Sequence, residues 1–243
     1  MIEDQKVIVI DAGNTSIKAG YFLNDDLINV KRFTMDSIKE LCEWQESLNI
    51  SEIVLSSVLN KEDTKTIQKY FEDLFIVNNN TTLPFEIVYK TPKSLGIDRI
   101  CNACYCYNHS KTKFAVSIDI GTCIKFDLID KKSGYIGGSI SPGIDLRFKS
   151  LNDYTGNLPL LSNKTLVPIV GASTESSITS GVMNGLQNEI NGLMNHYSLE
   201  FNDLTFFVTG GDASFFDLES KNDIFADENL TIKGLYEIYK HNA

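Results

Sequence analysis

A segment near the start of the chain recurs about a hundred residues later, and this repeat constrains the fold more than any other feature. VIVIDAGNTSIKAGYF occupies residues 7–22, and AVSIDIGTCIKFDLI occupies residues 115–129. Each copy runs from an apolar, strand-like stretch through Asp, Gly and Thr to Lys, with Asp11 and Asp119 at the same place. The repeat indicates two related halves within one chain.

The sequence around each copy predicts the same order of elements, three strands followed by alternating helices and strands. In the first half we expect an antiparallel meander, helices at 37–48 and 61–74, and strands at 52–58 and 85–90. Ser37 and Glu40 have the spacing of a capping box for the first of these helices.

In the second half the sequence predicts the same pattern, interrupted by a long loop rich in turn formers at 152–173. A loop of this length in a compact protein is usually functional. The other expected elements are strands at 113–119, 123–130, 134–141 and 204–209, and helices at 143–151, 174–199 and 230–242.

The repeat also predicts the domain organisation. No Pro- or Gly-rich linker separates the copies, and we place the boundary near residue 110, giving halves 1–110 and 111–243. Ligands commonly bind in clefts between such halves, and we expect one here.

Composition excludes several classes of protein. Hydrophobic residues make up 42% of the chain and charged residues 22%, as in globular proteins with a proper core. The formal charge of −10 argues against nucleic acid or anionic membrane as a partner. The N-terminal sequence does not resemble a signal peptide and no stretch is apolar enough to span a membrane, so we expect a cytoplasmic protein.

Three of the five cysteines cluster as Cys101, Cys104 and Cys106, with His109 close behind. Thiolates at this spacing can hold zinc or an iron–sulfur cluster, but a second CxxC pair is missing. The same segment has helical apolar spacing, and free cysteine is one of the most buried residue types. Both interpretations stay open, as does the role of the cluster.

The repeated motif suits a phosphate and a divalent cation. Backbone N–H groups exposed at a glycine turn bind anions, and Lys18 adds a positive charge. A carboxylate at the end of the strand, Asp11, can hold Mg²⁺, which prefers oxygen ligands and keeps several waters. A simple hairpin whose Asp and Asn shape the turn explains one copy equally well. Two copies, and a third glycine turn at TGGDA (209–213), favour the phosphate-binding interpretation.

A duplicated DxG[NT] turn followed by a strand and a GG turn resembles the phosphate and adenosine motifs of the superfamily that contains acetate and sugar kinases, heat-shock ATPases and actin. DAGNTSIK, LGIDR, DIGTC, GGSISPG and TGGDA, in this order between residues 7 and 213, resemble the motif set of type III pantothenate kinases. The resemblance implies an α/β fold of two ribonuclease H-like, actin-like ATPase domains. Each would be a mixed sheet with helices on its faces, with a cleft between the domains.

The resemblance implies phosphorylation of pantothenate by ATP to 4′-phosphopantothenate, the first step of coenzyme A biosynthesis. It makes Asp11 the residue that organises Mg²⁺, and Asp119 a ligand of a monovalent cation, K⁺ or NH₄⁺. The nucleotide-binding residues that it implies are Asp11, Ala12, Gly13, Asn14, Thr15, Ser16, Ile17, Lys18, Thr122, Gly210 and Gly211.

The resemblance makes Asp98 the general base that takes the proton from the pantothenate hydroxyl. Arg99 would pair with an anionic group. The remaining implied substrate contacts are Tyr89, Gly96, Ile97 and Thr174. Taken without the family, the sequence favours Asp98 as a first-turn helix residue and Arg99 as part of a surface pair. Tyr89 also suits a strand and Thr174 a helix cap.

One departure concerns the second turn. Many relatives have Ala and Thr where this chain has Cys123 and Lys125, so the second turn carries an extra positive charge. This charge can touch a phosphate or mimic a cation, which puts the need for potassium in doubt. Members of the family are homodimers, and we expect a homodimer here on that ground alone.

The sequence also bears on two rival functions. A regulatory protein on this fold that binds ATP without phosphotransfer does not need Asp98 and Arg99 at the acceptor site. A sugar kinase needs a larger acceptor domain than 243 residues provide. The P-loop pattern GxxxxGK[ST] does not occur, and the three histidines form no hydrolase motif.

Overall fold

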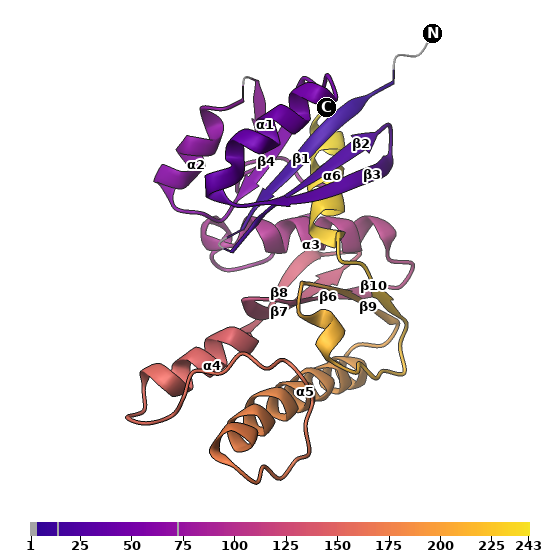
Figure 1. The fold of residues 1–243 in the computed structure, drawn as a ribbon. Helices are drawn as coiled ribbons and strands as arrows, with labels where there is room; N and C mark the ends of the chain where they lie inside the picture. Colours follow the sequence, from indigo (N-terminus) through magenta and orange to yellow (C-terminus); the bar gives the residue numbers. More distant parts are fainter. Residues whose placement is uncertain (1–3, 14, 72) are drawn as a thin grey trace. The chain divides into compact units, whose positions relative to one another are not determined.

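The two copies of the repeated segment form matching antiparallel hairpins in two separate sheets. The first copy forms β1 (Lys6–Ala12) and β2 (Ile17–Leu23), and the second forms β6 (Phe114–Ile120) and β7 (Cys123–Asp130). These facts come from a computed structural model that describes residues 4–13, 15–71 and 73–243. Figure 1 shows both hairpins within their sheets.

The remaining strands extend the two hairpins in the same way. In the first sheet β3 (Asp26–Phe33) lies antiparallel to β2, while β4 (Glu52–Ser57) and β5 (Leu74–Ile76) run parallel to β1. In the second sheet β8 (Gly134–Pro142) is antiparallel to β7, and β9 (Leu204–Thr209) and β10 (Ile224–Ala226) are parallel to β6. The orders β3-β2-β1-β4-β5 and β10-β9-β6-β7-β8 confirm the duplicated α/β fold.

The chain divides into two units that differ at one end from the halves expected above. Unit 1 comprises Met1–His109 and Asn229–Ala243, and unit 2 comprises Ser110–Glu228. The helices of unit 1 are α1 (Ile38–Ser47), α2 (Lys61–Gln68), α3 (Ile97–His109) and α6 (Leu230–Asn242). Assigning residues 229–243 to the second half was therefore wrong.

Close packing explains why the last helix belongs to unit 1. The ring of Tyr236 stacks on Phe22 of β2 with 4.0 Å between centroids. On α6, a Cβ added to Gly234 would lie 1.9 Å from the carbonyl oxygen of Cys101 on α3, so the two helices approach closely only because this residue is glycine. These contacts unite segments that are distant in the sequence.

The first sheet buries both faces because four consecutive residues of its central strand, 7–10, are apolar and buried. Ile8 and Ile10 belong to a core with residues of α1 and α2. Val7 and Val9 point to the opposite face, as the strand period of two requires, and Val9 is the cross-strand partner of Gly20, which lies against Ile232 of α6. Full burial of each such side chain contributes about 1.5–3 kcal/mol.

In unit 2 the two helices cover one face of the sheet. Apolar side chains of β6 and β7 share a core with α4 (Ile144–Asp153) and α5 (Thr174–Glu200). Ile118 and Phe126 are among them. In Figure 1 α4 and α5 run along the same side of the β6–β10 sheet. The long helix expected at 174–199 is confirmed.

Three local expectations need correction. Residues 85–90 do not form a strand. The edge strand of the first sheet is β5, which follows α2, and α2 is shorter than the expected helix at 61–74. The capping box joins Thr34 and Ser37, where the Thr34 N–H donates to Ser37 Oγ at 2.9 Å, in place of Ser37 and Glu40. The strand β10 has no counterpart in the elements expected from the sequence.

Among the described residues, no helix is both long enough and apolar enough to cross a membrane.

Candidate active site

Asp11 lies near the end of β1 and is flanked on both sides by polar residues of neighbouring strands. Lys18 of β2 is its cross-strand partner, and Ser56 of β4 is its parallel neighbour. Ser56 Oγ donates a hydrogen bond of 2.8 Å to Asp11 Oδ1, and Ser56 is only 1% exposed. The buried hydroxyl orients the carboxylate on a rigid part of the sheet.

The turn after Asp11 is closed by its own backbone. The Gly13 N–H donates to the Ser16 carbonyl at 3.1 Å, and a Cβ on Gly13 would lie 3.2 Å from the same oxygen. The side chains of Ala12 and Ile17 are buried, so these two residues offer a ligand only backbone groups. Asn14, also predicted to bind nucleotide, lies outside the described residues, while Thr15 is exposed.

Asp119 has the same position in unit 2. Lys125 of β7 is its cross-strand partner, and Thr209 of β9 is its parallel neighbour. Here the two charged groups meet: Lys125 Nζ lies 2.7 Å from Asp119 Oδ2, and both side chains keep about 15% of their surface exposed. Each unit therefore places an Asp between a Lys and a hydroxyl residue at the end of its central strand.

The turn that follows Asp119 is held by two other segments of unit 2. The Gly143 N–H donates to the Thr122 carbonyl at 3.0 Å, and a Cβ on Gly143 would lie 2.0 Å from the Gly121 oxygen. From the other side, the Asp212 N–H donates to the Ile120 carbonyl at 2.9 Å. The Thr122 side chain is exposed at the apex of this braced turn.

The two glycines of the TGGDA turn have different structural roles. Gly210 has φ of +102°, and a Cβ there would lie 2.2 Å from the Ile120 carbonyl oxygen. Gly211 is exposed, and a Cβ built on it would meet none of the described atoms within 4 Å. Gly210 is thus required by the packing of the turn, whereas the space over Gly211 is open to a ligand.

The GIDR segment begins α3 in unit 1. Ile97 and Arg99 are buried, whereas Asp98 is half-buried in the first helical turn. A Cβ on Gly96 would lie 2.5 Å from Asp98 Oδ1, so glycine lets the carboxylate fold back over the start of the helix. The preceding segment is fixed by Asn79, whose side-chain amide donates to the carbonyls of Pro92 and Leu95 at 3.0 and 2.9 Å.

A buried thiol links Asp11 and Asp98. Burial raises the pKa of Cys101 well above its usual range, and the charges of Asp11 and Asp98 raise it further. Two carboxylates from different elements of unit 1, Asp11 of β1 and Asp98 of α3, thus both raise the pKa of one buried thiol. Sequence order alone does not show this, because the two residues are 87 positions apart.

The other two predicted substrate residues belong to other segments of the chain. Tyr89 is half-buried in an irregular segment of unit 1. Thr174, in unit 2, is the exposed first residue of α5, and the cap of that helix is Ser173, whose side chain accepts from the Ser176 N–H at 3.2 Å.

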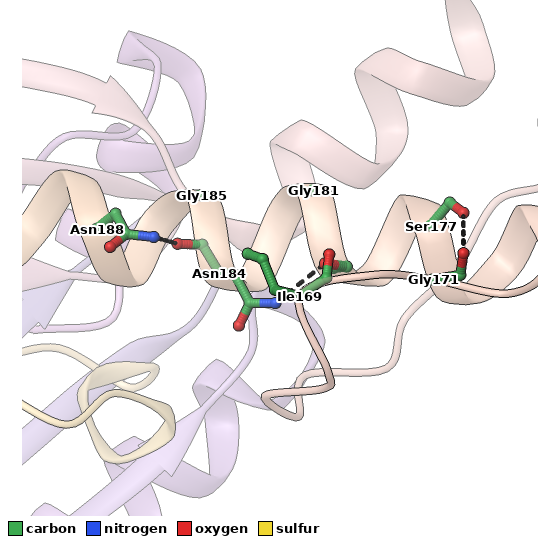
Figure 2. A pocket seen from close by; sticks show the side chains of 8 residues that line it. Ile169, Gly171, Ser177, Gly181, Asn184, Gly185 and Asn188 are labelled. Carbon is green, nitrogen blue, oxygen red and sulfur yellow. Dashed lines mark hydrogen bonds between the residues drawn. The ribbon is translucent and has the colours of Figure 1, made fainter.

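A hollow of about 390 Å³ lies along α5 near Thr174 (Figure 2). Ser180 Oγ donates to the Ile169 carbonyl at 2.7 Å, and the Asn184 side chain donates to the Val167 carbonyl at 3.0 Å. These bonds tie the preceding loop to the helix. None of the predicted site residues that the structure describes lines this hollow, so we assign it the structural task of positioning the loop that leads to Thr174.

Asp11 fits a magnesium site. Mg²⁺ in nucleotide enzymes is held by one or two carboxylates together with substrate phosphates and waters, and Asp11 supplies one oriented carboxylate beside a glycine turn. Asp119 does not fit a monovalent cation in the same way, because Oδ2 is already paired with the ammonium group of Lys125.

Two site features were missed from the sequence. Ser56 and Thr209 stand beside the two aspartates, and the common signal was a hydroxyl residue at the end of each parallel strand, in VLSS and FFVT. Lys164, in the long loop, donates to Asp145 at 2.8 Å and to Asp212 at 3.0 Å, and so ties the loop to the TGGDA turn. No sequence signal singles out that lysine.

The two sheets, with the same strand arrangement in each unit, define a class of protein, the α/β proteins with a duplicated ribonuclease H-like fold. A glucokinase of the ROK family from Streptomyces griseus, solved with glucose and AMPPNP, superposes with a TM-score of 0.53 over 95% of this chain and 97% of its own, at 12% identity. A Campylobacter jejuni protein described as a Baf family transcriptional activator superposes with a TM-score of 0.62 over 97% and 98% of the chains, at 24% identity. These likenesses show the fold.

The sequence comparisons narrow the class. The profile of the type III pantothenate kinase family matches residues 7–196. A type III pantothenate kinase from Christiangramia forsetii is 39% identical over 241 residues, which cover 97% of this chain and 98% of that protein. The chain belongs to the type III pantothenate kinase family and is a kinase.

Proposed function

We propose that this protein transfers the γ-phosphate of ATP to the hydroxyl group of pantothenate, producing 4′-phosphopantothenate for coenzyme A biosynthesis. Membership of the family supports the reaction. The structural observation that carries the proposal is the carboxylate of Asp11, which the buried Ser56 hydroxyl orients through a hydrogen bond of 2.8 Å beside the closed glycine turn. This carboxylate suits the nucleotide, and that of Asp98 suits the acceptor.

Asp98 is the proposed general base. It is half-buried at the start of α3, where Gly96 leaves room for its carboxylate. When the hydroxyl of pantothenate attacks the γ-phosphorus, its proton passes to Asp98, and a base of this kind contributes about 10²–10⁴-fold. Arg99 follows directly on the helix and provides a fixed positive charge for an anionic group. Tyr89, Gly96, Ile97 and Thr174 are the further proposed substrate contacts.

The glycine turns are the proposed nucleotide site. In unit 1 Lys18 offers a positive charge to phosphates, and a glycine turn of this kind offers them backbone donors. In unit 2 Thr122 is the proposed phosphate contact, and the backbone at Gly210 and Gly211 is the proposed adenosine contact. Mg²⁺ held by Asp11 would neutralise charge on the phosphates. We also propose a homodimer, on the basis of the family resemblance.

The test is a phosphotransfer assay with ATP, Mg²⁺ and pantothenate on the wild type and Asp98→Asn. We expect turnover in the wild type and a loss of at least about 100-fold in the variant. Binding of a non-hydrolysable ATP analogue should be retained, because Asp98 acts on the acceptor. Equal rates would remove Asp98 from the mechanism, and an unreactive wild type that binds the analogue would refute the kinase function.

A matched control separates catalysis from helix stabilisation. Glu62→Gln removes an acidic group from the first turn of α2, where it is exposed. Loss of a favourable charge at a helix N-terminus costs about 0.3–1 kcal/mol of stability. If Asp98 served α3 only in this way, both variants would lose similar stability and neither would lose its rate.

A further inference from the structure

The ion pair between Lys125 and Asp119 stands where the family resemblance implies a bound monovalent cation. The two residues face each other across β6 and β7, where opposed Cβ atoms are about 4.5–5.5 Å apart. Lys125 Nζ lies 2.7 Å from Asp119 Oδ2. A cross-strand pair in the middle of a sheet is fixed by the register of the backbone, so the ammonium group is held at the carboxylate by the fold itself.

The ammonium group of Lys125 can supply the positive charge that a bound cation would supply beside Asp119. It carries a single positive charge, and the ammonium ion is similar in size to K⁺. Asp119 directly precedes the Ile120–Gly121–Thr122 turn, which is braced by Gly143 and by Asp212. A second cation bound by the same carboxylate would be repelled by the lysine at short range.

Both side chains keep some exposure, 16% for Lys125 and 15% for Asp119, so the pair is accessible to a ligand at the turn. Because the pair is partly shielded, its field is screened less by salt than that of a surface pair.

We propose that Lys125 is a built-in replacement for the monovalent cation and supplies the positive charge at the second phosphate turn. Phosphotransfer by this chain is then independent of K⁺ and NH₄⁺. This inference rests on the proposed kinase function and refines its cofactor requirement. It replaces the expectation that Asp119 holds a monovalent ion.

The first test compares phosphotransfer rates in potassium, ammonium and tetramethylammonium chloride at equal ionic strength. The wild type should show the same rate in all three salts within about twofold. In Lys125→Thr the carboxylate regains room for an ion, and we expect K⁺ or NH₄⁺ to raise the rate at least about tenfold over tetramethylammonium, the scale of one short-range charge interaction. Lys132→Thr, which removes the same charge from the exposed turn after β7, should behave as the wild type.

The second test observes the ion without turnover. Crystals soaked in Tl⁺, an electron-dense analogue of K⁺, should show no anomalous peak at Asp119 in the wild type and a peak there in Lys125→Thr. The melting temperature of the variant, but not that of the wild type, should rise when K⁺ replaces tetramethylammonium. Lys125→Gln, which keeps a long side chain, serves if Lys125→Thr does not fold.

The outcomes that overturn the inference are distinct from failure of the kinase proposal. Potassium activation of the wild type, or a Tl⁺ peak at its Asp119, overturns it. So does a lysine variant that gains no ion and no cation dependence. If pantothenate is not phosphorylated under any condition, the kinase proposal fails, while the Tl⁺ and melting experiments still decide the role of Lys125.

Discussion

Ser56 Oγ donates a hydrogen bond of 2.8 Å to Asp11 Oδ1 from the neighbouring parallel strand. The hydroxyl is buried and orients a carboxylate that we assign to Mg²⁺. Groups that orient a metal ligand typically change affinity or activity about 10–100-fold when removed. We therefore expect Ser56→Ala to lower kcat/KM for MgATP about tenfold and to raise the Mg²⁺ concentration needed for half-maximal rate.

The adjacent serine provides the control for this prediction. Ser57 is the parallel neighbour of Ala12, and its Oγ bonds to Thr64 Oγ1 at 2.7 Å. Loss of either hydrogen bond should cost about 1 kcal/mol of stability. Ser57→Ala should leave the Mg²⁺ dependence unchanged, and equal kinetics for the two variants would show that the bond to Asp11 has no role in nucleotide binding.

The two glycines of the TGGDA turn should respond differently to alanine. Gly210→Ala forces a positive φ on a residue with a Cβ and drives that Cβ into the Ile120 carbonyl, so we expect a loss of at least about 1–3 kcal/mol in the free energy of unfolding. Gly211→Ala meets no described atom and should leave stability within about 0.5 kcal/mol. Urea unfolding measures both.

The same pair tests the adenosine assignment. If the adenosine approaches the backbone at Gly211, the methyl group of Gly211→Ala should weaken binding of an ATP analogue in calorimetry while the fold is intact. Undiminished binding in that variant would place the adenosine elsewhere.

Buried thiols predict a loss of stability at alkaline pH. Burial, aided by the charge of Glu237, raises the pKa of Cys104 to about 12 from 9.0. The folded state therefore keeps a proton that the unfolded state releases, so this contribution to stability is complete below about pH 9 and is lost as the pH rises towards 12. One such thiol lowers the free energy of unfolding by up to about 1.4 kcal/mol per pH unit.

Urea unfolding of the reduced protein from about pH 8 to about pH 10.5 checks this, with Cys104→Ala as the comparison. The variant should lose stability less steeply than the wild type because it lacks the titrating group. Parallel pH profiles would mean that the thiol does not titrate differently in the folded and unfolded states.

Cys123 should be the most reactive thiol. Cys42, Cys101, Cys104 and Cys106 are buried, whereas Cys123 is half-exposed and directly follows Thr122. Buried thiols are inert to alkylation. Iodoacetamide should therefore modify Cys123 first, as read by peptide mass spectrometry, and saturating MgATP should slow that reaction several-fold. An unchanged rate would argue against phosphates at Thr122.

Much of the fold could be predicted from periodicity and repetition. Apolar runs ending in Asp11 and Asp119 correctly indicated two equivalent hairpins, and the regular spacing of Ile178, Val182 and Leu186 indicated the long helix α5. These features are local, so the residues that determine them are adjacent in sequence. The strand expected at 85–90 failed because an apolar stretch shows burial or β propensity but does not show which edge it joins.

The site was only partly predictable for the same reason. The motif residues are recognised by their order along the chain. Their partners are not, because Ser56 reaches Asp11 through strand pairing and Lys164 reaches Asp212 across a long loop. The Lys125 charge was visible in the sequence, but its 2.7 Å contact with Asp119 was not.

The sequence by itself determined the duplicated pattern, the turns and the family, since all of these are written in consecutive residues. The tertiary structure alone decided that α6 belongs with the first sheet, that Asp11 and Asp98 act on one thiol, and that a lysine occupies the carboxylate of Asp119. Each of these depends on the register of strands and on the packing of helices that are distant in sequence. Side-chain volume and burial select this register and packing only once the whole core has formed.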